Sequence, residues 1–259
     1  MKRALVMNHS GLGDLLMMVP CLRELYNQGY MTTLMCREEV KTSHLLDDCP
    51  YVDELVEVAN PWQSSDFDEQ IEFNRGTFTA LSSEFDWSGK TEQIDMPFGV
   101  HKIDHMAKEL GITLTSRNPE VFISKEIKRE AQEHIDSTLS EDFLFLHSTV
   151  PNHPIHNFDN AEQWTRDNLS YSSVYKPFEN NVPKHENINF SFAIMEKALS
   201  VVLCSSVFVH CSDALGIWVD AISYGCQDRK VLPVNLDKVL RIREMGSWLE
   251  RNNRIWGIK

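Results

Sequence analysis

An acidic residue follows two glycines directly behind a short apolar run near the start of the chain. The run is 4–7, and the stretch behind it reads Ser10-Gly11-Leu12-Gly13-Asp14. Glycine permits a tight turn and a close approach of the backbone to a ligand. A carboxylate at such a turn can serve as a general base, or it can stabilise the start of a helix through the helix dipole. From the residue types alone, both roles of Asp14 stay open.

The spacing around Asp14 does not fit a dinucleotide-binding turn. That motif has the pattern Gly-x-Gly-x-x-Gly, and its third glycine is missing here. The sequence also offers no clear strand-end acid to bind a ribose. These two departures argue against a Rossmann-type dehydrogenase and make the turn a poor phosphate cradle.

Apolar periodicity predicts alternating strands and helices around this turn. A strand at 4–7 precedes a helix that starts at Asp14, contains Pro20 and ends at Gly29, because glycine favours a C-cap. Residues 61–98 show no clear period. Short strand–helix–strand links are typical of an open parallel α/β sheet. Further strands are expected at 31–36, 52–58 and 119–124, and further helices at 37–46, 101–112 and 125–139.

A second α/β pattern begins at the apolar stretch 142–149. Strands are expected at 142–149, 206–211 and 230–234, and helices at 192–202, 213–223 and 235–252, the last interrupted at Gly246. The sequence therefore predicts two Rossmann-like domains, 1–135 and 136–259. The charged stretch 125–139 is a candidate linker region, or a helix with a solvated face.

Charge and cysteine content limit the partners and the compartment. The net charge is −13, and such an acidic surface repels polyphosphate, which argues against a nucleic-acid partner. The six cysteines lack C-x-x-C spacing and, without a signal peptide, indicate buried thiols in a reducing compartment. No apolar run reaches the length of a membrane span. We therefore expect a cytoplasmic protein with at most peripheral contact with the inner face of a membrane.

The N-terminal part of the chain resembles glycosyltransferase family 9, the heptosyltransferase family. Members begin with a strand, an (S/G)xGD turn and a helix with a proline near its second turn, and Ser10–Asp14 and Pro20 take these places. The family's NPYVDEV-like segment is matched by CPYVDE at 49–54. Residues 100–112, where a basic residue precedes a helix ending in Leu-Gly, also resemble the family.

The second half resembles the family more loosely. Residues 143–150 resemble the strand whose small and hydroxyl residues meet the donor phosphates, and residues 209–223 resemble the D(S/T)GxxHxAAA segment at the mouth of the nucleotide site. In this alignment Asp213 opens the motif, Leu215 replaces its glycine and Trp218 replaces its histidine. The family's lysine after the phosphate loop is absent, and His156 stands nearest to its place.

The resemblance implies a GT-B fold, in which two Rossmann-like domains with parallel sheets face each other across a cleft. It implies metal-independent transfer of a sugar, often a heptose, from a nucleotide diphosphate sugar to a hydroxyl of a glycan or glycolipid. Asp14 would be the general base, in an acceptor-side turn with Ser10, Gly11 and Gly13. No cofactor is expected besides the nucleotide sugar. The residues implied on the donor side are Ser148, Thr149, His156, Asp213, Ala214 and Leu215, the last two through backbone amides at a helix N-terminus.

Simpler roles compete with these assignments. Ser148, Thr149 and Asp213 are also residue types that favour turns and helix caps. The missing lysine and histidine leave a second hypothesis open, a nucleotide-sugar-binding protein on a decayed GT-B scaffold. GT-B proteins often carry a C-terminal helix that crosses back to the first domain, and Trp248 and Trp256 would anchor such a helix here.

The histidines do not predict a metal site. His147, His153 and His156 lie near the expected phosphate loop, but their spacing matches no metal-binding motif. His101 and His105 share one face of the expected helix 101–112. A partly exposed pair at a cleft or on the surface is the simpler interpretation of these two residues.

Overall fold

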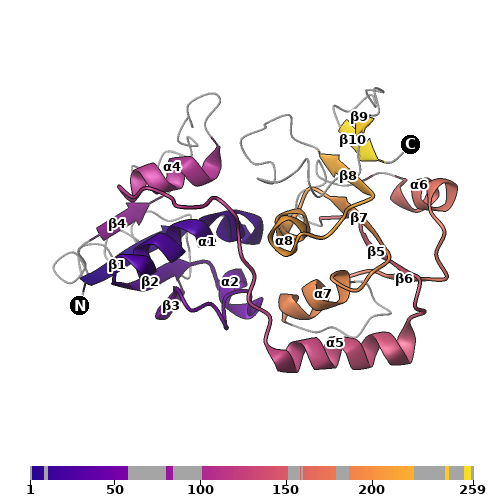
Figure 1. Ribbon diagram of the computed structural model, residues 1–259, viewed down its shortest axis with the longest axis horizontal. Coiled ribbons are helices and arrows are strands. Elements are labelled where there is room, and N and C mark those ends of the chain that lie inside the picture. The colour runs from indigo at the N-terminus through magenta and orange to yellow at the C-terminus, as the bar shows by residue number, and fades with distance from the viewer. Residues whose placement is uncertain are drawn as a thin grey trace. The chain divides into compact units, whose positions relative to one another are not determined.

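The computed structural model shows a chain of two α/β units (Figure 1). It describes residues 2–8, 11–57, 80–83, 101–150, 158, 160–178, 187–224, 243–244 and 254–257. By their contacts, residues 1–120 form unit 1, and unit 2 begins at Val121. Helix α5 (Lys125–Thr138) packs on α7 (Ile188–Met195), so it lies within unit 2, whereas the sequence analysis expects a domain boundary at 135/136.

Unit 1 contains a parallel sheet with the strand order β3-β2-β1-β4. Strand β4 lies in the stretch 61–98, where the sequence showed no period. Ala4, Leu5 and Val6 of β1 are at most 1% exposed, as expected for a parallel strand covered on both faces. The strands are Lys2–Asn8 (β1), Tyr30–Cys36 (β2), Glu54–Glu57 (β3) and Ala80–Ser83 (β4).

Helix α1 (Leu12–Asn27) follows β1 directly. Pro20 lies inside the helix without ending it, and Gly29 just beyond its end has φ +79°, a conformation that glycine adopts without strain. The helix packs on β2 and on α4 (Lys102–Glu109), where the Cys21 thiol lies 3.8 Å from the carbonyl oxygen of Ile103. The predicted helices at 14–29 and 101–112 are confirmed. The predicted helix at 37–46 is reduced to α2 (Glu38–Thr42), and 119–124 forms no strand.

Buried polar contacts attach the segment after α4 to α1. Glu24 is 4% exposed and accepts hydrogen bonds from the Thr115 backbone N–H, at 3.0 Å, and from its hydroxyl. These hydrogen bonds hold the pKa of Glu24 below its usual value. Arg23 pairs with Glu120, which also accepts a hydrogen bond from the Tyr51 hydroxyl at 2.8 Å. Residues 115–120 are therefore tied to α1 at several points.

We expect Thr115→Val to destabilise the protein. It removes the hydroxyl donor to a buried carboxylate, and such a loss costs about 1–3 kcal/mol. Urea denaturation would measure the change in the free energy of unfolding. Thr42→Val is the control, because Thr42 is exposed at the end of α2. Equal stability of the two variants would contradict a structural role for the contact between Glu24 and Thr115.

Unit 2 contains a mixed sheet with the order β6-β5-β7-β8-β10-β9. The first four strands are parallel, and β10 pairs antiparallel with both β8 and β9. The strands are Phe143–His147 (β5), Ser173–Tyr175 (β6), Ser200–Cys204 (β7), Ala221–Tyr224 (β8), Arg243–Glu244 (β9) and Arg254–Gly257 (β10). Together with unit 1, this confirms the predicted α/β class with parallel sheets.

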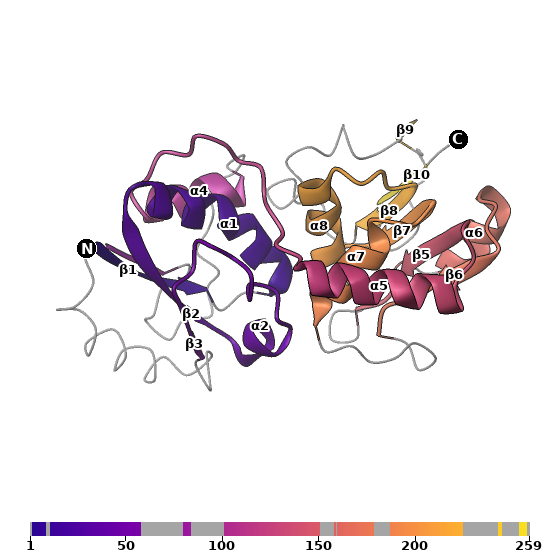
Figure 2. The ribbon, with the colours of Figure 1, turned by 60° about the horizontal axis from the view of Figure 1, so that its bottom comes forward.

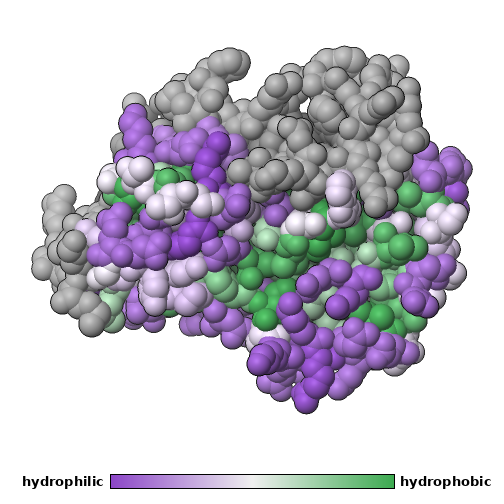
Figure 3. Space-filling model, viewed as in Figure 1, coloured by the Kyte–Doolittle hydropathy of each residue, from purple (hydrophilic) through white to green (hydrophobic). Residues whose placement is uncertain are grey.

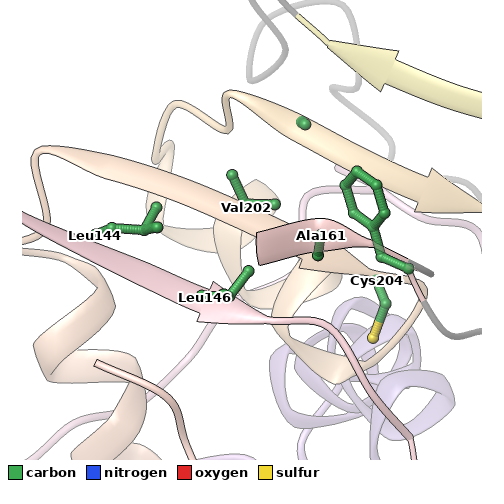
Figure 4. Packing of buried hydrophobic residues seen from close by; sticks show 7 residues of the cluster. Leu144, Leu146, Ala161, Val202 and Cys204 are labelled. Carbon is green, nitrogen blue, oxygen red and sulfur yellow. The ribbon is translucent and has the colours of Figure 1, made fainter. Parts of the chain in front are cut away.

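Alternating side chains of β5 pack on the two faces of this sheet. On one face, Leu144 and Leu146 join Val202, Cys204 and Ala161 in a cluster, with Ala161 contributed by helix α6 (Ala161–Asn168) (Figure 4). On the opposite face, aromatic rings pack together from β5, β6, α7 and helix α8 (Val207–Leu215). Helices cover both faces, which explains why β5 is apolar from Phe143 to Leu146.

Several elements of unit 2 differ from the predictions. The expected helix 192–202 is the end of α7 followed by β7, and the expected strand 206–211 belongs to α8. The expected helix 213–223 is the end of α8 followed by β8. The described parts of the C-terminal tail, β9 and β10, are strands rather than the predicted terminal helix. Periodicity failed for α8 because this helix is buried around most of its surface, so that its apolar run resembles a strand.

Helix α5 separates polar from apolar side chains. Figure 2 shows α5 lying along α7, and Figure 3 shows hydrophilic residues on its outer surface, while Ala131 and Ile135 are buried. Five cysteines are buried free thiols, and Cys226 is outside the described residues. Among the helices that the structure describes, none is long and apolar enough to cross a membrane.

Candidate functional site

Among the described parallel strands of each unit, the strand order reverses beside the first strand, β1 or β5. In unit 2 the chain passes from β5 to β6 on one side, and later to β7 on the other side of β5. In unit 1 the reversal lies between β1 and β4. Ligands of open α/β sheets bind at the carboxyl ends of the strands beside such a reversal. The residues that follow β1, β5 and β7 are therefore the candidates.

In unit 1, Asp14 lies in the first turn of α1, just after β1. Gly11 is the N-cap of this helix and has no side chain that could cap it. The Asp14 Oδ1 lies 2.9 Å from Nζ of Lys102, the first residue of α4. The Asp14 side chain is 27% exposed and that of Lys102 is 15% exposed. The ion pair holds the carboxylate in place at the strand edge while leaving it accessible to solvent.

The neighbours of Asp14 leave space at this edge. Gly11 has φ −70°, which any residue can adopt, and a Cβ at this position would meet no atom within 4 Å. Gly13 lies inside the first turn of the helix. Ser10 lies outside the described residues. Lys102 was not predicted from the sequence. The available signal was its position directly after His101, the residue that caps α4. The His101 imidazole accepts a hydrogen bond from the Ile103 N–H there.

In unit 2, Ser148 and Thr149 directly follow β5, as predicted. The Ser148 carbonyl oxygen accepts a hydrogen bond from the Phe158 N–H at 2.8 Å. Both residues retain exposed surface at the strand end. His156 is outside the described residues.

The structure corrects the placement of Asp213, Ala214 and Leu215. These residues form the C-terminal end of α8, which stops at Gly216 with φ +66°, so their backbone amides are not at a helix N-terminus. Asp213 is also buried, at 6% exposure. The strand-to-helix turn of this segment instead lies where β7 ends and α8 begins, at Ser205 and Ser206.

The corrected position changes the comparison with the D(S/T)GxxHxAAA motif. Ser205 takes the place of its acid, Ser206 that of its hydroxyl residue and Val207 that of its glycine. His210 then stands at the motif's histidine, which Trp218 had been assigned to replace. His210 is 8% exposed on α8, and Trp218 is 53% exposed beyond the helix.

His147 joins the ends of β5 and β7. Its Nδ1 lies 3.1 Å from the Ser206 hydroxyl and 3.4 Å from the Cys204 sulfur, and its ring centre lies 4.7 Å from that of Phe208. Burial lowers the pKa of His147 to about 4, so its imidazole is neutral at physiological pH. Burial also raises the pKa of Cys204 to about 12, so the sulfur is a thiol. Ser206, the N-cap of α8, makes no capping hydrogen bond and faces His147 instead.

The buried imidazole predicts a loss of stability in acid. Between pH 6.5 and about pH 4, His147 is protonated in the unfolded chain but stays neutral in the folded protein. The free energy of unfolding therefore falls by up to about 3 kcal/mol as the pH drops through this range. Urea titrations of the wild type and of His147→Gln at pH 7, 5.5 and 4.5 measure this contribution. The difference in stability between them should shrink toward low pH; a constant difference would show that His147 does not cause the loss.

The other histidines form no metal site in the described part of the chain. No three His, Cys, Asp or Glu side chains come together there in a metal-binding arrangement. His153, like His156, is outside the described residues. His101 caps α4, and His105 is buried at 8% exposure, so the interpretation of these two residues as a partly exposed pair is wrong for His105.

Comparisons with known proteins identify the fold. The sequence matches no family model and no curated protein. The structure is similar to a family 9 glycosyltransferase from Veillonella parvula DSM 2008, with a TM-score of 0.65 and 16% identity over 96% of this chain and 88% of that one. A likeness at this identity establishes the fold alone.

Two further structures agree with this result. The dodecameric iron-containing glycosyltransferase TibC from enterotoxigenic E. coli H10407 gives a TM-score of 0.56 at 13% identity, over 97% of this chain and 73% of that one. The E. coli heptosyltransferase WaaC, solved with ADP-2-deoxy-2-fluoro heptose, gives 0.52 at 14% identity, over 82% and 86%. The chain therefore has the fold of glycosyltransferase family 9.

Proposed function

We propose that this chain, which has the fold of glycosyltransferase family 9, transfers a sugar from a nucleotide diphosphate sugar to a hydroxyl acceptor. The observation that carries the proposal is the position of Asp14, an accessible carboxylate held by Lys102 beside the strand reversal of unit 1. Asp14 takes the acceptor's hydroxyl proton as the acceptor oxygen bonds to the anomeric carbon. The bond from that carbon to the phosphate oxygen breaks, and the nucleoside diphosphate leaves with the electron pair.

The donor binds at the strand reversal of unit 2. Its diphosphate would lie against Ser148 and Thr149 after β5, and against Ser206 and the start of α8 after β7. Hydroxyl groups and a helix N-terminus stabilise the negative charge that grows on the leaving phosphate. This arrangement replaces the site first expected around Asp213. Catalysis also requires the two sites to face each other, as in the predicted GT-B arrangement.

The first prediction on function concerns Asp14. Asp14→Asn removes the proton acceptor but keeps the shape of the side chain, so kcat should fall about 10²- to 10⁴-fold. Calorimetry should find nucleotide affinity within a few-fold of the wild type, because the donor site is elsewhere. ADP is the first nucleotide to test, followed by GDP, UDP and dTDP, with the matching nucleotide sugars for turnover. Retained activity would remove Asp14 from the mechanism.

A second prediction concerns Lys102, which we propose positions the Asp14 carboxylate. Lys102→Met should lower kcat about 10- to 100-fold, because a small misplacement of a reacting group has effects of this size, while KM for the donor stays the same. Arg117→Met is the matched control, since Arg117 pairs with Asp104 on the same helix at 3.0 Å, but with both side chains more exposed. Equal kcat values for the two variants would show that Lys102 has no special role.

A non-catalytic nucleotide-sugar-binding protein is the second candidate function. It is favoured by the corrected motif, in which Ser205 replaces the acid and Val207 replaces the glycine. Wild-type binding of a nucleotide sugar without transfer or hydrolysis would support this candidate over the first.

Several other parts of the proposal rest on the sequence and the fold. The acceptor is a glycan or glycolipid, reached by a cytoplasmic protein through peripheral contact with a membrane. No metal takes part, although TibC contains iron. Activity that survives treatment with a chelator would support metal independence.

A further inference from the structure

An exposed aromatic ring stands beside the donor edge of unit 2. Phe178 lies just after the carboxyl end of β6, the strand next to β5. Its side chain is 59% exposed, whereas the largest buried side chains of unit 2 are also phenylalanines. Exposure of so large an apolar group gains little for folding, since its surface stays in contact with water.

The backbone at Phe178 is also strained. Its φ is +69°, in the left-handed region that a bulky side chain rarely adopts. Strain of this kind persists where the surrounding structure imposes it, and it is concentrated at functional sites. A phenylalanine in this conformation gains no backbone energy and leaves more than half of its surface in water, so folding alone does not account for its position.

The surroundings of Phe178 fix its ring at the strand ends. The ring centre lies 6.3 Å from that of His147 and 6.0 Å from that of Phe208. The His147 imidazole in turn reaches the Ser206 hydroxyl at the start of α8. One side of the Phe178 ring is therefore supported by buried rings, and its exposed part lies next to the place proposed for the diphosphate.

We propose that Phe178 is the platform on which the base of the donor nucleotide stacks, an inference that rests on the proposed function. An aromatic ring offers a flat apolar surface to any purine or pyrimidine, and stacking tolerates changes of base. Because the ring lies on the same edge as Ser148 and Ser206, a nucleoside diphosphate can place its phosphates on the hydroxyl groups and its base on Phe178. Phe178 is thus a binding residue for the nucleotide and takes no part in bond making.

Calorimetry on the full chain tests this proposal with two kinds of ligand. The first is whichever of ADP, GDP, UDP and dTDP binds the wild type most tightly, and the second is inorganic pyrophosphate, which has no base. Phe178→Ala should weaken nucleotide binding about 5- to 150-fold, which corresponds to the loss of one stacked base. Pyrophosphate affinity should stay within about two-fold. Phe178→Trp should keep nucleotide affinity, because indole also stacks.

A further variant separates a binding role from a structural one. Glycine adopts the left-handed backbone without strain, whereas alanine does not. The Tm of Phe178→Gly should therefore be up to about 4 °C higher than that of Phe178→Ala, and not lower. Its nucleotide affinity should nevertheless fall as far as that of Phe178→Ala. A wild type that binds none of the four nucleotides would overturn the proposed function and this inference with it. A wild type that binds, together with unchanged affinity in Phe178→Ala, or equal losses for nucleotide and pyrophosphate, would overturn this inference alone.

Discussion

The reversal of strand order within a parallel sheet is the constraint on which the rest of this structure depends. Parallel strands cannot be joined by tight hairpins, so a helix must carry the chain back, and the next helix begins at the carboxyl edge. In unit 1 this edge holds Asp14, in the first turn after β1, and in unit 2 it holds Ser206, the N-cap after β7. Both candidate sites thus lie at the carboxyl edge of a sheet beside its strand reversal, with Asp14 after the first strand of unit 1 and Ser206 after the strand across the reversal from β5.

The two edges differ in their electrostatics. In unit 1 a carboxylate and an ammonium group, Asp14 and Lys102, form an ion pair that water still reaches. In unit 2 the corresponding polar group, His147, is enclosed by aromatic rings and stays neutral. The first edge suits proton transfer. The second edge provides neutral hydroxyl donors. Because His147 is neutral, it does not supply the positive charge that a lysine would bring there.

The sequence predicted some elements well because local patterns specify them. The turn before α1, the apolar face of α4 and the fully buried β5 were all identified, since their periods or flanking residues are distinctive. The segment from Ile188 to Leu215 was misassigned because its two helices are buried around most of their surface and lack a polar face. That error moved the donor motif to Asp213. Capping residues held the correct signal, with Ser206 before α8 and Gly216 after it.

By itself, then, the sequence determined the α/β class, the carboxylate turn at Asp14 and the strand end at Ser148. Each of these follows from residues adjacent in the chain. Only the tertiary structure decided that Lys102 pairs with Asp14, that His147 is neutral and that Phe178 lies beside the end of β5. These features depend on contacts between distant segments and on burial, which no local window of sequence contains. Side chains acquire their chemical environment when the sheets assemble, and the surroundings of Lys102, His147 and Phe178 arise at that step.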